Sequence, residues 1–174
     1  MKRGMVSLSG YFWSMPVKFI ADCMLGKLAK WLKIFGFDAL FFSKIEDEKI
    51  LALAEKEDRV LLTRDTRLIE KARSIRSLFI ENEDWPSQVE QVLDEFRLWK
   101  GVKPYTRCIE CNAVLKPLPK RRAKNLVTPF VYENADSFAI CTVCGRLFWK
   151  GTHHRDMEHK MKEILRKKSR GENS

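Results

Sequence analysis

The sequence predicts a mainly parallel α/β domain followed by a small cysteine-rich domain. Short apolar runs alternate with amphipathic helical stretches through residues 17–100, which is typical of parallel strands joined by right-handed crossovers. Four of the five cysteines lie beyond residue 100, in two C-x2-C pairs. The charge of the 174 residues is divided in the same way: residues 1–100 hold 17 Lys and Arg against 16 Asp and Glu, whereas residues 101–174 hold 16 against 7. The basic second half indicates either a polyanionic partner or simple solubility.

The elements of the first domain follow from the spacing of apolar residues. Leu25, Leu28 and Leu32 lie on one stripe of a helix, and Gly36 ends that helix. The apolar run within residues 59–63 is typical of a strand that is covered on both faces. In chain order we expect strand 17–21, helix 24–35, strand 37–42, helix 47–57, strand 59–63, a short helix to residue 73, strand 77–80 and helix 86–98.

The second domain is expected to begin near Gly101–Pro104 and to end in a basic helix. Its expected elements are short strands around 113–115, 127–132, 137–140 and 147–149, and a terminal helix over 153–168. Residues 1–16 are expected to form a flexible N-terminal extension, because serine and glycine interrupt their apolar stretch, and Met15 is a better start. Because this stretch does not fit a signal peptide and no apolar run approaches the ~20 residues of a membrane span, we expect a cytoplasmic protein without a membrane partner.

The four distal cysteines have the spacing of a structural zinc site. Cys108 and Cys111 are separated by 29 residues from Cys141 and Cys144, and two such pairs present four thiolates in a tetrahedral array. A disulfide within each pair, an iron–sulfur cluster and a redox role remain as alternatives. Cys23 has no histidine partner in the first domain, so we expect a small buried apolar residue rather than a nucleophile.

Acidic residues follow several of the predicted strands. Asp22 ends the first strand, Asp65 follows the third, and Asp47 opens the second helix. Glu81 and Asp84 follow the fourth strand. Because the carboxyl ends of parallel strands meet at one edge of a sheet, these carboxylates are expected to converge there, and their oxygens suit Mg²⁺ or Mn²⁺. Two such ions ~3.5–4 Å apart activate a water for phosphodiester hydrolysis. The alternative is that these acids only cap helices or lie in loops.

Basic residues provide candidate contacts to nucleic acid in both domains. Lys27 and Arg64 are expected near the acids, where they could contact phosphate oxygens. Residues 120–124 add a basic cluster on a constrained loop, and nearby aromatic residues could stack on single-stranded bases. His153 either contacts phosphate or packs against Trp149. The candidate nucleic-acid ligands are Lys27, Arg64, Lys120, Arg121, Arg122, Lys124 and His153.

Four stretches of the chain carry a resemblance to a known family. They read FIADCMLGKLAKWLKIFGFD, DEKILALAEKEDRVLLTRD, CIECN and CTVCGRLFWKGTHHRDM. In this combination and order, the chain resembles the Mut-seven C-terminal RNase domain family, a PIN-like ribonuclease family, from about Lys18 to about Leu165. The resemblance implies an α/β fold with a PIN-like three-layer α/β/α sandwich over residues 17–100. It also implies a small zinc-ribbon domain with a basic C-terminal helix over residues 101–174.

The resemblance further implies an activity and the residues that perform it. The activity is that of a metal-dependent ribonuclease, expected to be endonucleolytic, in which a metal-activated water hydrolyses RNA phosphodiesters. Asp22 matches the first acid of the family, Asp47 the acid that opens the second helix, and Asp65 the acid after the third strand. PIN domains generally use three or four acids, and Asp84 is preferred to Glu81 as the fourth. If neither reaches the site, we expect one metal ion instead of two.

The sequence thus leads to an expected set of ligands and to competing functions. Asp22 and Asp65 are expected to hold Mg or Mn, the four distal cysteines one structural Zn, and the ribbon to aid the binding of single-stranded RNA. The alternative function is a non-catalytic RNA-binding adaptor of a ribosome or RNA-processing complex, because the basic charge lies away from the acids. A toxin-type nuclease with a partner inhibitor is a third alternative, against which the fused ribbon argues.

Overall fold

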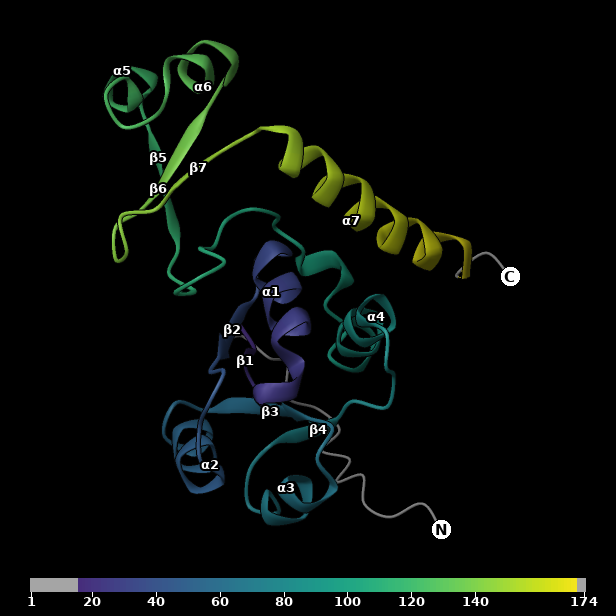
Figure 1. Cartoon of the computed structure of the whole chain (residues 1–174). Coiled ribbons are helices and arrows are strands. Elements are labelled where there is room, and N and C mark those ends of the chain that lie inside the picture. The colour runs from purple at the N-terminus through teal and green to yellow at the C-terminus, as the bar shows by residue number, and fades with distance from the viewer. Residues whose placement is uncertain (1–15, 172–174) are drawn as a thin grey trace.

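Four parallel strands form the sheet at the centre of the first domain (Figure 1). The computed structural model describes residues 16–171, without the side chains of residues 152, 153 and 169–171, so the extension expected over residues 1–16 lies almost entirely outside it. The strands lie in the order β2-β1-β3-β4, and all three pairings are parallel. Their bounds are β1 Lys18–Ala21, β2 Asp38–Phe41, β3 Arg59–Thr63 and β4 Ser77–Phe79. The four strands predicted for this domain are therefore confirmed.

Helices cover both faces of this sheet. Because successive side chains of a strand point to opposite faces, Phe19 and Leu62 pack with α1 and α4, whereas Ile20 and Leu61 pack with α2 and α3. The helices are α1 Gly26–Ile34, preceded by the 3₁₀ turn η1 Cys23–Leu25, α2 Asp47–Lys56, α3 Thr66–Lys71 and α4 Trp85–Glu95, followed by the 3₁₀ turn η2 Trp99–Gly101. The domain has the α/β organisation that the sequence predicts.

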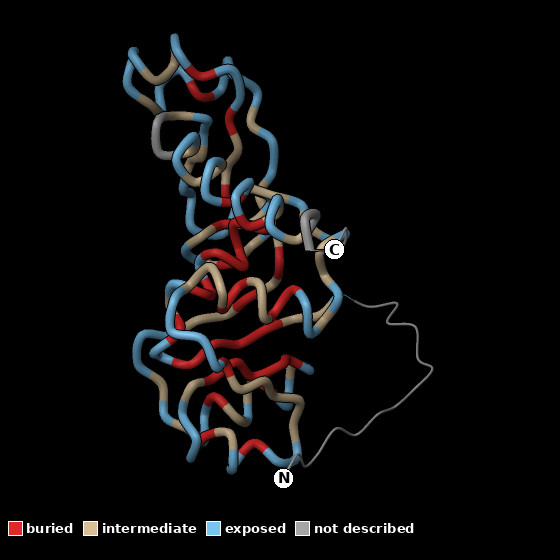
Figure 2. The backbone as a smooth tube through the Cα atoms, turned by 90° about the vertical axis from the view of Figure 1, so that its right-hand side faces the viewer, coloured by how far each residue is buried: buried red, intermediate tan, exposed pale blue. Residues whose placement is uncertain are grey.

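A second, antiparallel sheet follows the first domain. Its strands are β5 Leu115–Leu118, β6 Phe138–Cys141 and β7 Leu147–Trp149, in the order β5-β6-β7. The short helices α5 Lys120–Ala123 and α6 Pro129–Asn134 lie between β5 and β6 along the chain and share a small apolar cluster around Phe138. We refer to this sheet, these two helices and the two cysteine pairs as the distal domain. Figure 2 shows that burial is concentrated in the parallel sheet and its helices, whereas the distal domain is mainly exposed or intermediate.

Two predictions for the distal domain are wrong. The strand expected over 127–132 is instead helix α6, because the Thr128 side chain caps it and Pro129 fits the first helical position. The strand expected at 113–115 begins later, since Val114 makes only an isolated bridge before β5 starts. In both cases apolar residues typical of strands predicted a strand, but local capping or pairing determined the structure.

The last helix returns from the distal domain to the first domain. Helix α7 Thr152–Gly171 includes the helix expected over 153–168, and its second half lies beside α4 (Figure 1). Its Met161 and Ile164 are buried in the same core as α1 and α4. The apolar stripe of α7 therefore completes one helical layer of the first domain. Within residues 16–171, no helix has both the length and the apolar composition needed to cross a membrane.

Candidate active site and metal centre

The strand order creates one point in the sheet from which the chain departs in opposite directions. β1 and β3 are neighbours, but the chain leaves β1 through α1 toward β2 and leaves β3 through α3 toward β4, on the opposite face. Ligands of open α/β sheets bind outside the carboxyl ends of the strands at such a point. We refer to the residues that follow β1, β3 and β4 here, namely 22, 64–65 and 81–84, as the acidic edge.

Asp22 follows β1 directly and is buried, with 5% of its surface exposed. Its Oδ1 accepts a hydrogen bond from Met24 N at 2.8 Å, which caps η1. Its Oδ2 accepts hydrogen bonds from the Thr63 hydroxyl and from Arg64 N, the latter at 3.3 Å. Among the described residues the donors to Asp22 are neutral, so hydrogen bonds orient this buried carboxylate without a Lys or Arg partner.

Thr63 joins Asp22 to the second acid of the edge. Its buried hydroxyl donates to Asp22 and accepts a hydrogen bond from Asp65 N at 2.9 Å. Asp65 is exposed and caps α3, since its Oδ1 accepts from Arg67 N at 2.7 Å and from Leu68 N at 3.2 Å. The sequence analysis assigned no role to Thr63, although its place between β3 and Asp65 was a usable signal.

Asp47 lies at the start of α2 and is bound by Lys71, the last residue of α3. Its Oδ2 accepts a hydrogen bond from Lys71 Nζ at 2.8 Å. The hydrogen bond and charge of Asp47 raise the pKa of Lys71, and the charges of Glu48 and Asp65 add to the shift. Lys71 therefore contacts the acid of α2 and is also influenced by the charge of the acid that caps α3, a link that the sequence analysis missed.

The acids after β4 make no hydrogen bond with Asp22, Thr63 or Asp65 within the described residues. Asp84 is exposed and caps α4 by accepting a hydrogen bond from Ser87 N at 3.1 Å. That hydrogen bond, with a further contribution from the charge of Lys167, lowers the pKa of Asp84. Glu81 is exposed as well, and its backbone N–H donates to Gln91 Oε1 at 3.1 Å. The capping role considered for single acids is thus present at Asp22, Asp65 and Asp84.

The structure brings some of the predicted acids together and leaves others separate. Thr63 connects Asp22 with Asp65, and Lys71 connects Asp47 with the charge of Asp65. In the part of the chain that the structure describes, no three carboxylates come within the 4.8 Å that joins the four distal cysteines. The assignment of these acids to a metal site therefore remains a prediction.

The two cations expected beside the acids lie at this end of the sheet. Lys27 Nζ stands 5.6 Å from the centre of the Trp85 ring, at the start of α4. Arg64 donates through Nη1 to the Asn82 carbonyl and lies 3.6 Å from Glu83 through Nη2. Arg64 is therefore attached to the loop after β4. Cys23, which we expected to be buried, is exposed instead, because η1 buries Leu25.

The four distal cysteines form a compact cluster of thiols. Their Sγ atoms all lie within 4.8 Å of one another, with Cys108 to Cys144 at 3.7 Å and Cys111 to Cys141 at 3.3 Å. Tetrahedral zinc with Zn–S bonds of ~2.3 Å places its sulfur ligands about 3.8 Å apart. All four are free thiols, not disulfides. These residues could hold a zinc ion.

Each cysteine pair ends in a tight backbone turn. The residue after each pair, Asn112 or Gly145, has a positive φ, 66° and 72° respectively, which closes a tight turn around the thiols. The backbone N–H of Cys144 donates to the Cys141 sulfur and lowers the pKa of that thiol to about 6. Thiolate is the form that binds metal, and this turn favours it at Cys141, whereas burial raises the pKa of Cys108.

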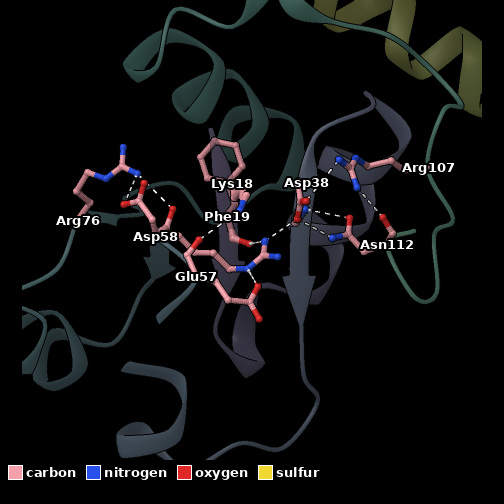
Figure 3. A network of polar contacts seen from close by, with 10 residues as sticks. Lys18, Phe19, Asp38, Glu57, Asp58, Arg76, Arg107 and Asn112 are labelled. Carbon is pink, nitrogen blue, oxygen red and sulfur yellow. Dashed lines mark hydrogen bonds and ion pairs between the residues drawn. The ribbon is translucent and has the colours of Figure 1, made fainter. Parts of the chain in front are cut away.

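A polar network holds the first cysteine pair against the amino ends of the parallel strands (Figure 3). The Asp38 Oδ1 accepts hydrogen bonds from Arg59 Nη1 at 2.5 Å and from Asn112 Nδ2 at 2.7 Å, and Arg107 lies 3.4 Å from its Oδ2. Burial raises the pKa of Asp38, but the hydrogen bonds from Arg59 and Asn112 outweigh it, so the net shift is downward. Asn112 Oδ1 also accepts from Ala39 N at 3.1 Å. Asn112 thus joins a cysteine pair to an edge strand.

The carboxyl end of α1 makes a second connection to the same cysteine pair. Buried Lys33 donates to the backbone carbonyls of Ile109 and Glu110, the latter at 3.4 Å. The Phe35 carbonyl accepts from Lys103 N at 3.0 Å. Gly36 has φ +93°, and a Cβ there would overlap the Lys103 carbonyl oxygen, so the chain can approach this closely only at glycine.

The basic cluster of the distal domain lies far from the acidic edge. Each of its four cations, Lys120, Arg121, Arg122 and Lys124, is exposed, and none makes an ion pair within the described residues. Phe130 nearby is 73% exposed, and Lys120 Nζ stands 5.4 Å from the Tyr132 ring centre. The distal domain is attached at the amino ends of the strands. Along β1, the four residue steps from Lys18 to Asp22, at ~3.3 Å each, separate these ends from Asp22 by about 13 Å. The side chain of His153, the last predicted nucleic-acid ligand, lies outside the described residues.

The arrangement can be compared with known proteins. A family model described as the Mut7-C RNAse domain matches residues 17–161. The matched residues include the acidic edge, the four distal cysteines and the first half of α7. Comparison with the curated proteins and with the solved structures gives no match.

Proposed function

The chain belongs to the Mut7-C RNAse domain family, and from this premise we propose that it is a metal-dependent endoribonuclease acting on single-stranded RNA. The observation that carries the proposal is the Asp22–Thr63–Asp65 arrangement at the point where the chain departs from β1 and β3 in opposite directions. In this proposal the first domain is PIN-like, with the acidic edge as its active site. We place the activity in the cytoplasm.

The donor chemistry of the acidic edge fits a hard divalent cation. Asp22 and Asp65 are the residues that would hold Mg²⁺ or Mn²⁺, because carboxylate oxygens are the ligands these ions prefer. When bound, such an ion lowers the pKa of a water molecule and stabilises the leaving oxygen. The hydrogen bonds from Thr63 and the η1 backbone hold the Asp22 carboxylate in a fixed orientation. The Asp65 Oδ2 accepts no hydrogen bond from the described residues, so it can serve a ligand.

Neighbouring residues are given supporting roles in the same proposal. Asp47 is the third acid, and Lys71 holds its carboxylate toward Asp65. Asp84 is preferred to Glu81 as a fourth acid, because it is fixed at the first turn of α4. Lys27 and Arg64 bind phosphate oxygens of the RNA, since cations at this end of the sheet offset the repulsion between carboxylates and the backbone.

The distal domain is proposed to be a zinc ribbon that aids RNA binding. One zinc per chain would be held by the four distal cysteines, whose spacing fits tetrahedral coordination. The exposed cations of the α5 region, Lys120, Arg121, Arg122 and Lys124, would contribute sequence-independent phosphate contacts.

Cleavage of labelled single-stranded RNA in Mn²⁺ or Mg²⁺ tests the proposal. We expect Asp22→Asn and Asp65→Asn to abolish cleavage and Asp58→Asn to leave it unchanged, because Asp58 is exposed at the amino ends of the strands and, among the described residues, forms its ion pair with Arg76. The products should carry 5′-phosphate and 3′-hydroxyl ends, as expected when an activated water attacks phosphorus.

Other outcomes of this experiment would contradict the proposal. Equal cleavage by the wild type and both active-site variants would remove the acidic edge from the mechanism. Products with a 2′,3′-cyclic phosphate would indicate attack by the ribose hydroxyl instead of water. RNA binding that is unaffected by Asp22→Asn, with no cleavage under any metal, would favour the adaptor function.

A further inference from the structure

A groove lies between the first turn of α4 and the second half of α7. Its volume is about 400 Å³. Trp85 lines it from the α4 side, and Lys160, Arg166 and Lys167 line it from α7. The groove exists because α7 packs back on the first domain through Met161 and Ile164, which places the basic surface of α7 beside α4.

The groove adjoins the acidic edge. Helix α4 begins directly after Asp84, so Trp85 is the first helical residue beyond the edge. Lys27, in the first turn of α1, stands over the same Trp85 ring. The charge of Lys167 is among the causes that lower the pKa of Asp84, so the α7 side of the groove is also electrostatically close to the edge. In contrast, residues 120–124 belong to the distal domain, which is attached at the opposite ends of the strands.

The charge of the groove is complementary to a polyanion. Its lining holds three cations and one acid, Glu163. Lys160 already pairs with Asp156 at 2.7 Å and Lys167 with Glu90 at 3.2 Å, but both lysines are well exposed. Solvent-exposed ion pairs contribute little to stability, so a phosphate backbone can compete for these cations at small cost.

An anchored aromatic ring adds a second kind of contact. Trp85 is half-buried, and its ring stacks on Trp31 with centroids 4.3 Å apart and planes 10° apart. The indole is therefore fixed in position before a ligand arrives. Aromatic rings beside cations are the pattern with which proteins bind single-stranded nucleic acid, because bases contact the ring while the cations contact phosphates. Trp31 covers one face of the indole and Lys27 stands over the ring, so a base reaches Trp85 at the ring edge or by displacing the Lys27 side chain.

We propose that this groove is a subsite for single-stranded RNA next to the acidic edge, with Trp85 contacting a base and Lys160, Arg166 and Lys167 contacting phosphates. The proposal rests on the ribonuclease function proposed above, and it specifies where the substrate strand runs. The RNA leaves the acidic edge past Lys27 and Trp85 and continues along α7. Helix α7 then makes the main contacts with the RNA, and the zinc ribbon contributes less to binding.

Three charge-matched double variants of the full chain test this assignment. The groove variant is Lys160→Glu/Arg166→Glu, and the ribbon variant is Lys120→Glu/Arg122→Glu. The control is Lys56→Glu/Arg73→Glu, whose residues are exposed on the α2 and α3 side of the sheet. Each variant changes the net charge by the same amount. Binding of a fluorescein-labelled single-stranded RNA is followed by anisotropy over a range of salt concentrations, without added divalent metal.

We expect the groove variant to bind the RNA at least tenfold more weakly than the control at ~0.1 M salt, with a salt slope lower by about 1–2. The ribbon variant should lose less affinity than the groove variant. Groove and control variants that bind equally would overturn the proposal, as would a ribbon variant that loses more. Binding of the wild type to phosphatidylserine vesicles but not to RNA would overturn it as well.

Two further measurements distinguish a loss of RNA binding from a loss of fold and from a failure of the ribonuclease site. Thermal unfolding followed by circular dichroism identifies a variant that has lost its fold, in which case Lys160→Gln/Arg166→Gln replaces it and is held to the same expectation. Asp22→Asn, in the same binding assay, should bind like the wild type. If Asp22→Asn still cleaves RNA while the groove variant loses binding, the ribonuclease site is wrong and the groove stands.

Discussion

The carboxylates at the two ends of the parallel sheet have different partners. At the amino ends, Asp38 meets two guanidinium groups and an amide, all within 3.4 Å. At the carboxyl ends, Asp22 meets a hydroxyl and two backbone N–H groups. The first arrangement balances charge within the protein, whereas the second orients a carboxylate and leaves its charge available. The amino ends carry the attachment of the distal domain, and the difference supports our proposal that a cation binds at the carboxyl ends.

Removal of zinc should give the largest loss of structure. The loss should be confined to the distal domain, which is attached at the amino ends of the strands. We expect about one zinc per chain by atomic absorption, and its release by a chelator should unfold the distal domain, since structural zinc contributes roughly 10 kcal/mol or more to small domains. Cys141→Ser should have the same effect, whereas Cys23→Ser should not, because Cys23 lies at the other end of the sheet. A zinc-free protein with disulfides within the cysteine pairs would contradict this expectation.

Neutralising Asp38 should lower the stability of the protein and leave RNA cleavage unchanged. Asp38→Asn removes one of the two carboxylates that pair with buried Arg59, and Glu57 remains at 2.7 Å. The free energy of unfolding in urea should therefore fall by about 2 kcal/mol, while RNA cleavage per folded molecule is retained. The matched change at exposed Asp58 should cost at most about 1 kcal/mol.

The stabilisation by Asp38 should also depend on pH. Its pKa is lowered in the folded protein from 3.8, so its contribution is complete above pH ~4 and is lost as the pH falls through the lowered value. The difference in stability between wild type and Asp38→Asn should therefore shrink in acid. A constant difference down to pH 2 would show that charge is not the cause.

Thr63→Val should weaken metal binding at the carboxyl ends and leave the distal domain intact. The change removes the hydroxyl that donates to Asp22 while keeping the shape of the side chain, and loss of such an orienting hydrogen bond typically costs 10–100-fold in metal affinity or activity. The apparent Mn²⁺ affinity, measured from the metal dependence of cleavage, should weaken. The distal domain should keep its zinc. A variant with unchanged metal dependence would remove Thr63 from the site.

The features that the sequence predicted are those controlled by local residues. Strands and helices of the first domain follow from apolar periodicity and from stops such as Gly36, so their bounds agree closely with the structure. The positions of Asp22 and Asp65 at strand ends follow from the same alternation. Helix α6 was missed because Val127, Val131 and Tyr132 favour a strand, whereas the cap at Thr128 and the proline after it determine a helix.

Features that depend on packing between distant segments could not be predicted from the sequence. The contact of Lys71 with Asp47 joins residues 24 positions apart, and that of Asn112 with Asp38 joins residues 74 apart. The amphipathic pattern of α7 predicts a buried stripe but not which domain covers it. For the same reason the basic end of α7 was expected in the distal domain, although it lies beside α4.

The return of α7 to the first domain makes the distal domain an insertion in topological terms. The chain departs after η2, builds the second sheet and comes back to complete the first core with Met161 and Ile164. Cutting the chain at residue 100 would remove α7 from the core of the first domain, so we expect the fragment to be less stable than the full chain. Conversely, the segment between η2 and α7 has both of its ends anchored on one scaffold. A module exchanged there would also have to replace Asn112 as the hydrogen-bond partner of Asp38 and Ala39.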